Sequence, residues 1–412
     1  MATSRHDDSD DSAQNEATGF SIFGGHLLAA PDGARAAPAL GEAASGLLDT
    51  LASLGIEEAE QVVAVAAIPD ARSELQQVLG LKDKAFQTFL DSVQGMLPAA
   101  RVAAFNSPSP KNLGLGVRPP TPEMMAAVER SAVESEAAEA VDLPASVNLI
   151  SFFQPIRNQG SRGTCVGFTL TALNEYITRR RGLVRDLSEQ HLYYETKLID
   201  GATASCGTWQ VKAVTVLSSR GQCREMVWPY LSALPCNNHG ALPAAARPDG
   251  LNYRLATLSV PPRNVAAYKT HMSKQRPVTI SIPVYNSWYQ SAATRQTGRI
   301  TMRIGNEVSI GGHAVCLVGY VDTAASPGGG YFIVRNSWGT AAFGSACPFG
   351  AGYGTIPYQY ITNDAWEAFT AAVPGINSTE DIDDDATGDR TGNGSTVTID
   401  IGPNVKITIQ SR

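Results

Sequence analysis

The spacing of hydrophobic residues predicts helices near the start of the chain. Between residues 42 and 98, leucine, isoleucine and valine recur every three or four positions, and Gly55 interrupts the run. This spacing places the apolar side chains on one face of a helix. We therefore predict a small helical module at residues 42–100.

Further along the chain, the hydrophobic pattern changes from helical spacing to alternation. Helices are predicted from Cys165, after Leu187 and over 208–220. Later segments have the length and the apolar content of strands. These predicted strands are 278–284, 313–321 and 331–336. Helices first and strands later indicate an α+β protein with two packed lobes.

The segments around the helical module differ from it in composition. Residues 1–41 are rich in Ala, Gly, Asp and Ser without periodicity, and they are predicted to be a disordered acidic N-terminus. Residues 101–142 read as a linker that contains a short acidic helix near 122–140. The module at 42–100 resembles helix-hairpin-helix modules, but its acidity argues against contacts with phosphates. No nucleic-acid partner is therefore expected, and docking to protein or self-inhibition is favoured.

The end of the chain is a separate pattern. Residues 376–395 form an acidic, Gly-rich linker, and residues 396–412 alternate apolar and polar positions on both sides of a Gly-Pro-Asn turn. That pattern predicts a β-hairpin with one apolar face. A lone hairpin is marginal in water, so its apolar face should find a partner. That partner could be this chain, a second copy or another protein.

Composition fits a globular protein and places no segment in a membrane. Hydrophobic residues make up 43% and charged residues 17% of the 412 residues, and no run of eighteen apolar residues occurs. The acidic start lacks the basic and apolar regions of a signal peptide. We therefore expect a cytoplasmic location, with specialised export left open.

The net charge of −7 conceals an uneven distribution. Residues 1–140 carry 20 acidic and 9 basic side chains, whereas residues 141–378 carry 12 acidic and 20 basic ones. An acidic N-terminal region could be attracted to a basic middle, and salt would weaken that attraction. The alternative is ordinary solvated charge on both parts.

The cysteines predict neither a disulfide framework nor a metal site. The six are Cys165, Cys206, Cys223, Cys236, Cys316 and Cys347. Setting Cys165 aside leaves an odd number, and the other five are interpreted as buried small hydrophobes. Free thiols suit a reducing compartment. Their spacing matches no metal-ligand motif, so neither a metal nor another cofactor is expected.

Cys165 stands where a nucleophile could be activated. It opens a predicted helix, and a helix N-terminus lowers the pKa of a thiol. Its own backbone N–H and the side-chain amide of Gln159 could stabilise the oxyanion formed by attack on a carbonyl. Gly160 and Gly163 would let the backbone turn between the two residues.

One of the six histidines is placed to serve such a nucleophile. His313 starts a strong predicted strand, and Asn336 closes the next one. Adjacent strands could bring the imidazole and the amide together, so that the amide orients the ring. Trp338 lies two residues further on, where it could shield that hydrogen bond from water.

With these motifs in place, the sequence resembles the papain-like cysteine peptidases (papain/cathepsin family), in a bacterial-type variant. The resemblance covers residues 143–375. The matching stretches are PIRNQGSRGTCVGF (155–168), LSEQ (187–190), GTWQ (207–210), WPY (228–230), RPVTISI (276–282), GGHAVCLVGY (311–320) and YFIVRNSWG (331–339). It implies a helical left lobe that carries the cysteine and an antiparallel, β-barrel-like right lobe that carries the histidine, with peptide substrate between them.

The resemblance also implies a role for each site residue. Cys165 would be the nucleophile, His313 its general base and acid, Asn336 the residue that orients the imidazole, and Gln159 the oxyanion donor. Two further residues, Gly207 and Trp338, would contact substrate, and Gly207 would pair its backbone with an extended chain. The family also carries an N-terminal pro-segment that runs backwards through the cleft, and residues 1–142 occupy that place in the sequence.

Two positions depart from the family pattern. Arg162 stands where relatives have a cysteine that is disulfide-bonded to a partner near the position of Cys206. Val166 replaces an aromatic residue after the nucleophile. Neither change removes a reacting group, although both alter the surroundings of the subsites.

The resemblance predicts a cysteine peptidase, raises the hypothesis that it is made as a zymogen, and leaves open whether it acts as an endopeptidase or an exopeptidase. Two alternatives are carried along with it. One is an amidase, deamidase or transpeptidase on the same triad, and the other is a catalytically silent binding scaffold. The four filled catalytic positions argue against the silent scaffold.

Overall fold

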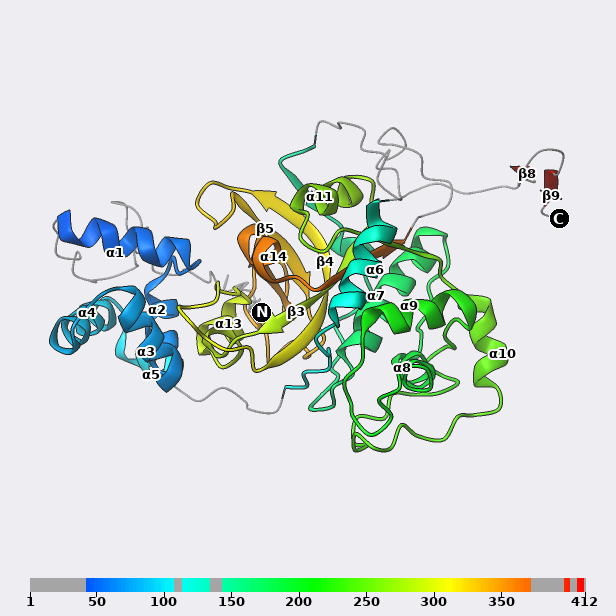
Figure 1. The fold of residues 1–412 in the computed structure, drawn as a ribbon, viewed down its shortest axis with the longest axis horizontal. Coiled ribbons are helices and arrows are strands. Elements are labelled where there is room, and N and C mark those ends of the chain that lie inside the picture. The colour runs from blue at the N-terminus through cyan, green and yellow to red at the C-terminus, as the bar shows by residue number, and fades with distance from the viewer. Residues whose placement is uncertain (1–41, 107–112, 134–142, 372–395, 401–405, 411–412) are drawn as a thin grey trace, which may run out of the picture. The chain divides into compact units, whose positions relative to one another are not determined.

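The computed structural model describes residues 42–106, 113–133, 143–371, 396–400 and 406–410 (Figure 1). The chain divides into two compact units, residues 1–375 and residues 376–412. The first unit holds the helices and the large sheet, and the second holds a two-stranded sheet. The predicted disordered segment 1–41 and the predicted linker 376–395 lie outside the described residues.

Five helices form an N-terminal module, as the apolar spacing predicts. They are α1 (Glu42–Ser53), α2 (Ala59–Ala66), α3 (Pro69–Val78), α4 (Asp83–Gly95) and α5 (Ala99–Phe105). Gly55 and Gly80 reverse the chain with positive φ angles, which glycine adopts without a steric penalty. A capping box between Glu58 and Gln61 starts α2, and every residue of α2 is buried. The module is therefore built around α2.

The N-terminal module is docked on the sheet-containing lobe. A single hydrophobic cluster runs from its buried residues into the sheet. Polar contacts accompany this packing, because the backbone N–H of Met302 donates to the carbonyl of Leu54 (2.9 Å) and that of Asn306 donates to Glu74 (2.9 Å). The module and the lobe thus share one core.

The left lobe is helical, as predicted. Its main helices are α7 (Cys165–Arg180), α8 (Glu189–Lys197) and α9 (Gln210–Ser219), and shorter ones are α10 (Ala246–Gly250) and the 3₁₀ turns Ile150–Phe152 and Leu251–Tyr253. Ser188 caps α8 by accepting a hydrogen bond from the backbone N–H of His191. The buried carboxylate of Glu367, which comes from the other lobe, accepts from the first two backbone N–H groups of α9. This contact ties the lobes together at a helix N-terminus, where a negative charge is favoured.

The right lobe is built on an antiparallel sheet of seven strands. They are β1 (Ser146–Asn148), β2 (Thr257–Ser259), β3 (Val278–Val284), β4 (Gly311–Asp322), β5 (Gly330–Arg335), β6 (Tyr353–Pro357) and β7 (Glu367–Ala371). The order is β2-β7-β3-β4-β5-β6, with β1 paired to β4. The sheet is open rather than closed into a barrel, because β2 and β6 are the two ends of that order and do not pair. Its helices are α11 (Val265–Ser273), α12 (Asn286–Tyr289), α13 (Ala292–Thr297) and α14 (Tyr358–Asp364).

The central strands set the position of the predicted site. His313 on β4 pairs with Ile282 on β3, and Cys316 on β4 pairs with Arg335 at the end of β5. Helix α7 packs against β4, and the hydroxyl of Thr169 donates to the carbonyl of Ala314 (2.8 Å). The start of α7, the start of β4 and the end of β5 therefore meet between the lobes (Figure 1).

Residues between the module and the two lobes differ in part from the linker that the sequence predicts. The acidic helix expected near 122–140 is α6 (Pro122–Val133), and residues 134–142 lie outside the described part. Residues 113–119 form no helix or strand, but they run between the lobes and make backbone hydrogen bonds with both of them. A Gly- and Pro-rich composition suits such an extended path as well as it suits a free linker.

The second unit contains the predicted hairpin. Strands β8 (Thr396–Asp400) and β9 (Lys406–Gln410) pair antiparallel, with Val397 opposite Ile409. The turn between the strands lies outside the described residues. None of the described helices has both the length and the apolar content needed to span a membrane.

Candidate active site

The predicted nucleophile is the first residue of α7 and is fully buried. Backbone N–H groups of Ala314, Gly116, Val166 and Cys165 itself lie near the Cys165 sulfur and favour the thiolate. Burial outweighs them and raises the pKa of the Cys165 thiol to about 11. The thiol in this structure is therefore neutral at physiological pH.

The predicted base and its orienting residue are in contact. The His313 Nε2 atom lies 2.8 Å from Oδ1 of Asn336, and that oxygen also accepts from the backbone N–H of Ser337 (2.7 Å). Because an amide oxygen is only an acceptor, Nε2 carries the proton and Nδ1 is the basic nitrogen. Among the described residues, Nδ1 of His313 has no hydrogen-bond partner. Burial lowers the pKa of His313 to about 4, against the effect of the Asn336 hydrogen bond.

Trp338 covers the imidazole. Its ring stacks on that of His313, with centroids 4.3 Å apart and planes inclined by 22°. Trp288 and Phe343 pack on the tryptophan in turn, and the indole is buried. The geometry agrees with the predicted shielding of the hydrogen bond between His313 and Asn336.

Gln159 is held in place by Ser337, the residue that follows Asn336. Its side-chain oxygen accepts from the Ser337 hydroxyl (2.6 Å), and its backbone N–H donates to the Ser337 carbonyl (2.8 Å). With the oxygen fixed in this way, the amide nitrogen points away from Ser337. It donates to the carbonyl of Arg162 (2.9 Å), in the loop 159–164 that precedes Cys165 and that we call the cysteine loop. It also donates to the carbonyl of Gly114 (3.0 Å).

An extended segment, which we call the strap (residues 113–119), passes over these residues. The carbonyl of Gly114 accepts from the side chains of both Gln159 and Trp338 (3.2 Å). Further on, the backbone of Thr208 donates to Gly116 (3.0 Å) and accepts from Arg118 (2.9 Å), so Val117 and Thr208 form a parallel bridge. The Val117 N–H donates to the carbonyl of Gly312 (3.0 Å) on the opposite lobe. The strap thus joins both walls through its backbone.

Two strap glycines allow this close approach. A Cβ atom at Gly114 would lie 2.2 Å from the carbonyl oxygen of Arg162, and one at Gly116 would lie 2.1 Å from that of Gly163. Both oxygens belong to backbone that cannot move aside without displacing the cysteine loop. Any side chain at these two positions is therefore incompatible with the strap as it lies here.

Beside Gly207, the backbone contact with the strap is made by the neighbouring Thr208. Thr208 supplies the N–H and the carbonyl that pair with the strap, whereas the Gly207 carbonyl accepts from Nζ of Lys197 (3.0 Å). A Cβ at Gly207 would lie 2.9 Å from the Arg118 side chain, so this glycine does border the strap. Whether Gly207 pairs with a substrate stays a prediction.

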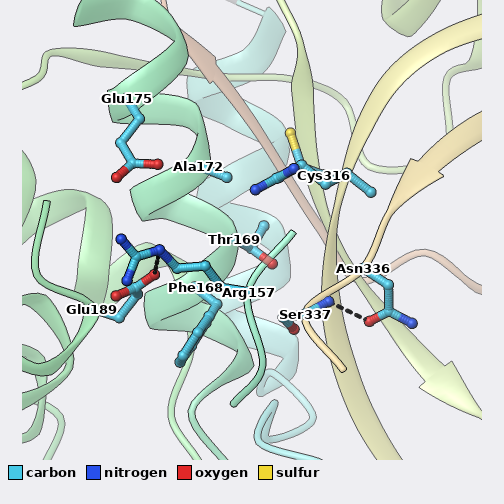
Figure 2. A pocket seen from close by; sticks show the side chains of 10 residues that line it. Arg157, Phe168, Thr169, Ala172, Glu175, Glu189, Cys316, Asn336 and Ser337 are labelled. Atoms are coloured by element: carbon cyan, nitrogen blue, oxygen red, sulfur yellow. Dashed lines mark hydrogen bonds and ion pairs between the residues drawn. The ribbon is translucent and has the colours of Figure 1, made fainter. Parts of the chain in front are cut away.

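A cluster of charged side chains that sequence reasoning missed lines a small cavity together with Asn336 and Ser337 (Figure 2). Glu175 and Glu189 from the left lobe line a cavity of about 10 Å³ with Arg335, Asn336 and Ser337 from the right lobe. Burial raises the pKa of Glu175 to about 7 and that of Glu189 to about 8. Glu175 lies in a stretch that has the pattern of an ordinary helix. Glu189 belongs to the matching stretch LSEQ (187–190), but nothing in that motif indicated a buried charge.

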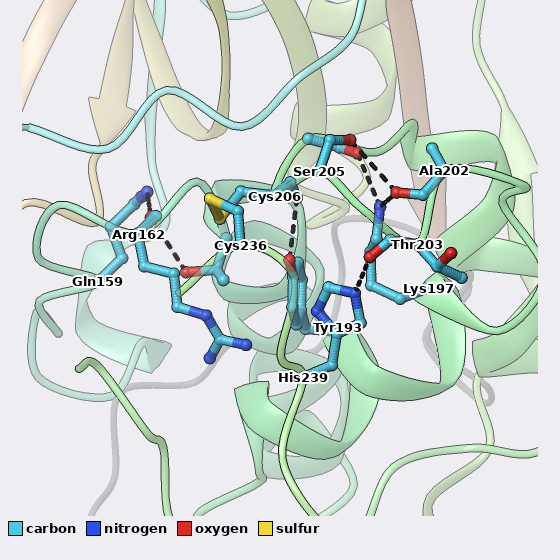
Figure 3. The surroundings of a disulfide bond; sticks show 12 residues. Gln159, Arg162, Tyr193, Lys197, Ala202, Thr203, Ser205, Cys206, Cys236 and His239 are labelled. Carbon is cyan, nitrogen blue, oxygen red and sulfur yellow. Dashed lines mark hydrogen bonds between the residues drawn. A yellow bond between two sulfur atoms is a disulfide. The ribbon is translucent and has the colours of Figure 1, made fainter. Parts of the chain in front are cut away.

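The structure contains a disulfide that the cysteine count did not predict. Cys206 and Cys236 are bonded to each other (Figure 3), so the interpretation of these two as free buried thiols is wrong. The error arose because an odd count excludes only complete pairing, and the free cysteines Cys165, Cys223, Cys316 and Cys347 are compatible with one bridge. These two cysteines therefore no longer support a reducing compartment, and the cytoplasmic location stays a prediction.

Within the described part of the chain, no group of three His, Cys, Asp or Glu side chains is arranged to hold a metal ion. The candidate site residues described above supply a thiol, an imidazole and two amides. Such a set can carry out nucleophilic acyl transfer.

Comparisons with known proteins agree with this chemistry. Residues 139–349, about half of the chain, match the model of the papain family cysteine protease. Similar proteins include cathepsin K of Gallus gallus (28% identical, over 46% of this chain and 52% of the relative) and papain of Carica papaya (29%, over 45% and 48%). The chain spans about half the length of the curated relatives it matches.

A solved structure shows the same fold. Xylellain, a cysteine protease from Xylella fastidiosa, superposes with a TM-score of 0.50 and 23% identity, covering 63% of this chain and 96% of that one. The site geometry, the family match and the shared fold all agree. The chain belongs to the papain family of cysteine proteases.

Proposed function

We propose that this protein hydrolyses peptide bonds through Cys165, His313 and Asn336, with Gln159 as the oxyanion donor. The hydrogen bond between His313 and Asn336 fixes the imidazole with its basic Nδ1 free. The same ring is stacked under Trp338, which restricts its rotation and keeps water from the hydrogen bond. These contacts support a ring poised to take a proton from the sulfur.

The proposed reaction has two stages, acylation of Cys165 and hydrolysis of the resulting thioester. The Cys165 proton moves to Nδ1 of His313, and the sulfur bonds to the substrate carbonyl carbon. The carbonyl oxygen becomes an oxyanion, which the Gln159 amide and the Cys165 backbone N–H stabilise. The imidazolium gives its proton to the leaving amine as the C–N bond breaks. Water, deprotonated by His313, then hydrolyses the thioester and regenerates the thiol.

We further propose that the strap holds the enzyme in an inhibited, zymogen-like state. The single observation that carries this proposal is the Gly114 carbonyl, which takes a hydrogen bond from the same Gln159 amide that would serve the oxyanion. The strap pairs in parallel with Thr208, and the backbone N–H of Gly116 lies near the Cys165 sulfur. A segment bound in this way would keep substrate from the site.

Burial by the strap also works against the reactive ionisation state. The thiol pKa near 11 and the imidazole pKa near 4 both favour the neutral pair over a thiolate and an imidazolium. Release of the strap would admit water and substrate, and it would return both pKa values towards the ion pair that attacks carbonyls.

A glycine substitution in the full-length chain tests both parts of the proposal. Gly116→Leu cannot keep the strap in place, because its Cβ would overlap the Gly163 carbonyl. Gly95→Leu in the N-terminal module is the matched control, since nothing lies within 4 Å of its Cβ. We expect Gly116→Leu to hydrolyse a fluorogenic peptide at least about 100-fold faster than wild type, a change worth about 2.7 kcal/mol, and Gly95→Leu to match wild type.

The outcomes separate inhibition from catalysis. Equal turnover by wild type and Gly116→Leu would refute inhibition by the strap while leaving the peptidase assignment intact. If Gly116→Leu exposes Cys165 to alkylation and still cleaves no peptide in a diverse library, the peptidase assignment is wrong. Cys165→Ala combined with Gly116→Leu should cleave no peptide.

A further inference from the structure

We propose that Arg162 is a positioning residue, whose side chain holds the loop 159–164 so that Gln159 points its amide at the oxyanion. The proposal rests on the oxyanion role given to Gln159 above. It concerns the residue that replaces a cysteine of the family pattern, and it assigns to that replacement a task in catalysis.

The Arg162 side chain is enclosed by the left lobe (Figure 3). It is only 3% exposed, and its Nη1 donates to Oε1 of Gln190 (2.8 Å) on α8 and to the carbonyl of Leu231 (3.0 Å). The guanidinium carbon lies over the rings of Tyr193 (4.7 Å to the centroid) and Tyr230 (5.9 Å). One side chain therefore connects the loop to α8 and to the segment around 230.

The backbone of Arg162 determines where the Gln159 amide can point. Its carbonyl oxygen accepts from Nε2 of Gln159 (2.9 Å) and from the backbone N–H of Thr164 (2.8 Å). A shift of this carbonyl would move one of the two acceptors that orient the amide. Because an oxyanion donor must lie about 3 Å from a developing charge, a shift of even part of an ångström would cost rate.

Tyr230 secures the two ends of the same loop. Its hydroxyl donates to the carbonyl of Gln159 (2.9 Å) and lies 2.6 Å from the hydroxyl of Thr164, next to the nucleophile. The ring of Tyr230 is one of the two that the Arg162 guanidinium contacts. Arginine and tyrosine thus act on the turn together, one on its middle and one on its ends.

The disulfide holds a neighbouring wall and leaves this loop without a covalent tie. Cys206 lies close by, since a Cβ at Gly163 would be 3.0 Å from its Cβ, but its sulfur is bonded to Cys236. Gln190, which accepts from Arg162, donates to the carbonyl of His239 (2.6 Å) near Cys236. The position of the loop therefore depends on hydrogen bonds and stacking to elements that the disulfide stabilises.

Arg162 is a costly choice if its only role is stability. Within the described part of the chain, its buried Nε and Nη2 have no hydrogen-bond partner. A buried, incompletely bonded cation is unfavourable, and apolar replacements of buried charges are often neutral or stabilising. A positioning role predicts that Arg162→Met lowers kcat while the melting temperature stays level or rises.

The test measures kcat, KM and melting temperature of Arg162→Met, Gln159→Ala and the double variant in the full-length chain. Wild type is the background if it turns over, and Gly116→Leu is the background if it does not. We expect Arg162→Met to lower kcat about 10- to 100-fold with KM within about threefold, which corresponds to 1.4–2.7 kcal/mol. In the Gln159→Ala background, Arg162→Met should lower kcat by less than about twofold, because the amide that Arg162 positions is gone.

Two further variants keep the test decisive. Arg162→Lys keeps the charge but loses the planar fork and should recover part of kcat, and Arg185→Met, at a partly exposed arginine of the same lobe, should change nothing. If Arg162→Met does not fold, Tyr230→Phe tests the same loop by the same cycle with Gln159→Ala. Equal losses in both backgrounds, or no loss at all, would overturn the positioning role. A harmless Gln159→Ala would instead refute the oxyanion assignment.

Discussion

The catalytic centre and the strap bind the same amide by different means. In the centre, side chains hold side chains, as with Asn336 on His313 and Ser337 on Gln159. In the strap, most of the hydrogen bonds to the site come from backbone N–H and carbonyl groups. The centre therefore depends on residue identity, whereas the strap depends on an unobstructed extended path. Under the proposed function, catalysis and inhibition compete for Gln159, and a change there should affect them in opposite directions.

The largest expected effect comes from removing the shared group. In a chain opened by Gly116→Leu, Gln159→Ala should lower kcat about 100- to 1000-fold, as loss of one oxyanion donor does elsewhere. In the otherwise wild-type chain, the same substitution removes one hydrogen bond to the strap. That bond is worth about 0.5–1.5 kcal/mol, so the rate at which iodoacetamide alkylates Cys165 should rise about 2- to 10-fold.

Iodoacetamide is the right probe for this comparison because its reaction with a thiolate forms no oxyanion. Ser337→Ala serves as the control, since it removes the hydroxyl that fixes the Gln159 oxygen and keeps the amide donor. It should show both effects in weaker form. A parallel fall of turnover and alkylation in Gln159→Ala would show that the two regions do not compete for this amide.

The next effect concerns pH and follows from burial under the strap. The Cys165 pKa is raised to about 11 in the closed form, so the thiolate is scarce at neutral pH and alkylation should increase with pH up to that value. In Gly116→Leu the increase should come at lower pH. At pH 7 the difference in thiolate content should be at least about 100-fold.

The imidazole gives the closed form an acid limit. Burial lowers the pKa of His313 from 6.5 to about 4 in the closed form, in which the strap covers the site. Between these pH values the imidazole is neutral in the closed form, whereas it would be protonated in an open form with an ordinary pKa. The closed form consequently loses stability as the pH falls from about 6.5 towards 4. Alkylation of wild type, corrected for thiolate content, should show the strap opening over this interval, and His313→Ala should abolish that acid step. A flat profile would show that the strap does not bury the imidazole.

The candidate centre could be proposed from sequence because its chemistry is carried by side chains in local motifs. Cys165 opens a helix, and His313 and Asn336 flank strong strands, so the pattern marked them as candidates and the resemblance to the papain-like family supplied their roles. The path of the strap had no such signal, because a Gly- and Pro-rich segment that binds through its backbone looks like a linker. Sequence position suggested a pro-segment, but not which residues would meet the site.

Other features needed the three-dimensional structure for separate reasons. Pairing of Cys206 with Cys236 depends on how two loops approach, which cysteine counting does not contain. Thr208, not its neighbour Gly207, pairs with the strap. A shift of one residue in register changes which of the two pairs, and the sequence does not specify that register. An open sheet and a closed one have the same alternation along each strand, so the predicted barrel-like form could not be distinguished from the observed one.

A smaller effect is expected at Trp338, which serves both regions. Trp338→Phe keeps an aromatic ring over His313 but removes the indole N–H that donates to Gly114 (3.2 Å). When Trp338→Phe is the only substitution, alkylation of Cys165 should rise about 2- to 5-fold, because this one long hydrogen bond is lost. Turnover of the opened chain should fall only a few-fold. A loss of turnover much larger than the gain in alkylation would place the main role of Trp338 in the centre.

The smallest effect is expected where the N-terminal module is anchored. Arg299 pairs with Glu58 (3.0 Å) and lies 3.6 Å from Glu57, but it is about one-third exposed, so solvent screens the pair. Exposed ion pairs contribute at most about 1 kcal/mol, whereas the shared hydrophobic cluster anchors the module more firmly. Arg299→Gln should therefore raise alkylation of Cys165 less than about threefold, and 0.5 M salt should mimic it. A larger effect would mean that charge, rather than apolar packing, keeps the module and the strap in place.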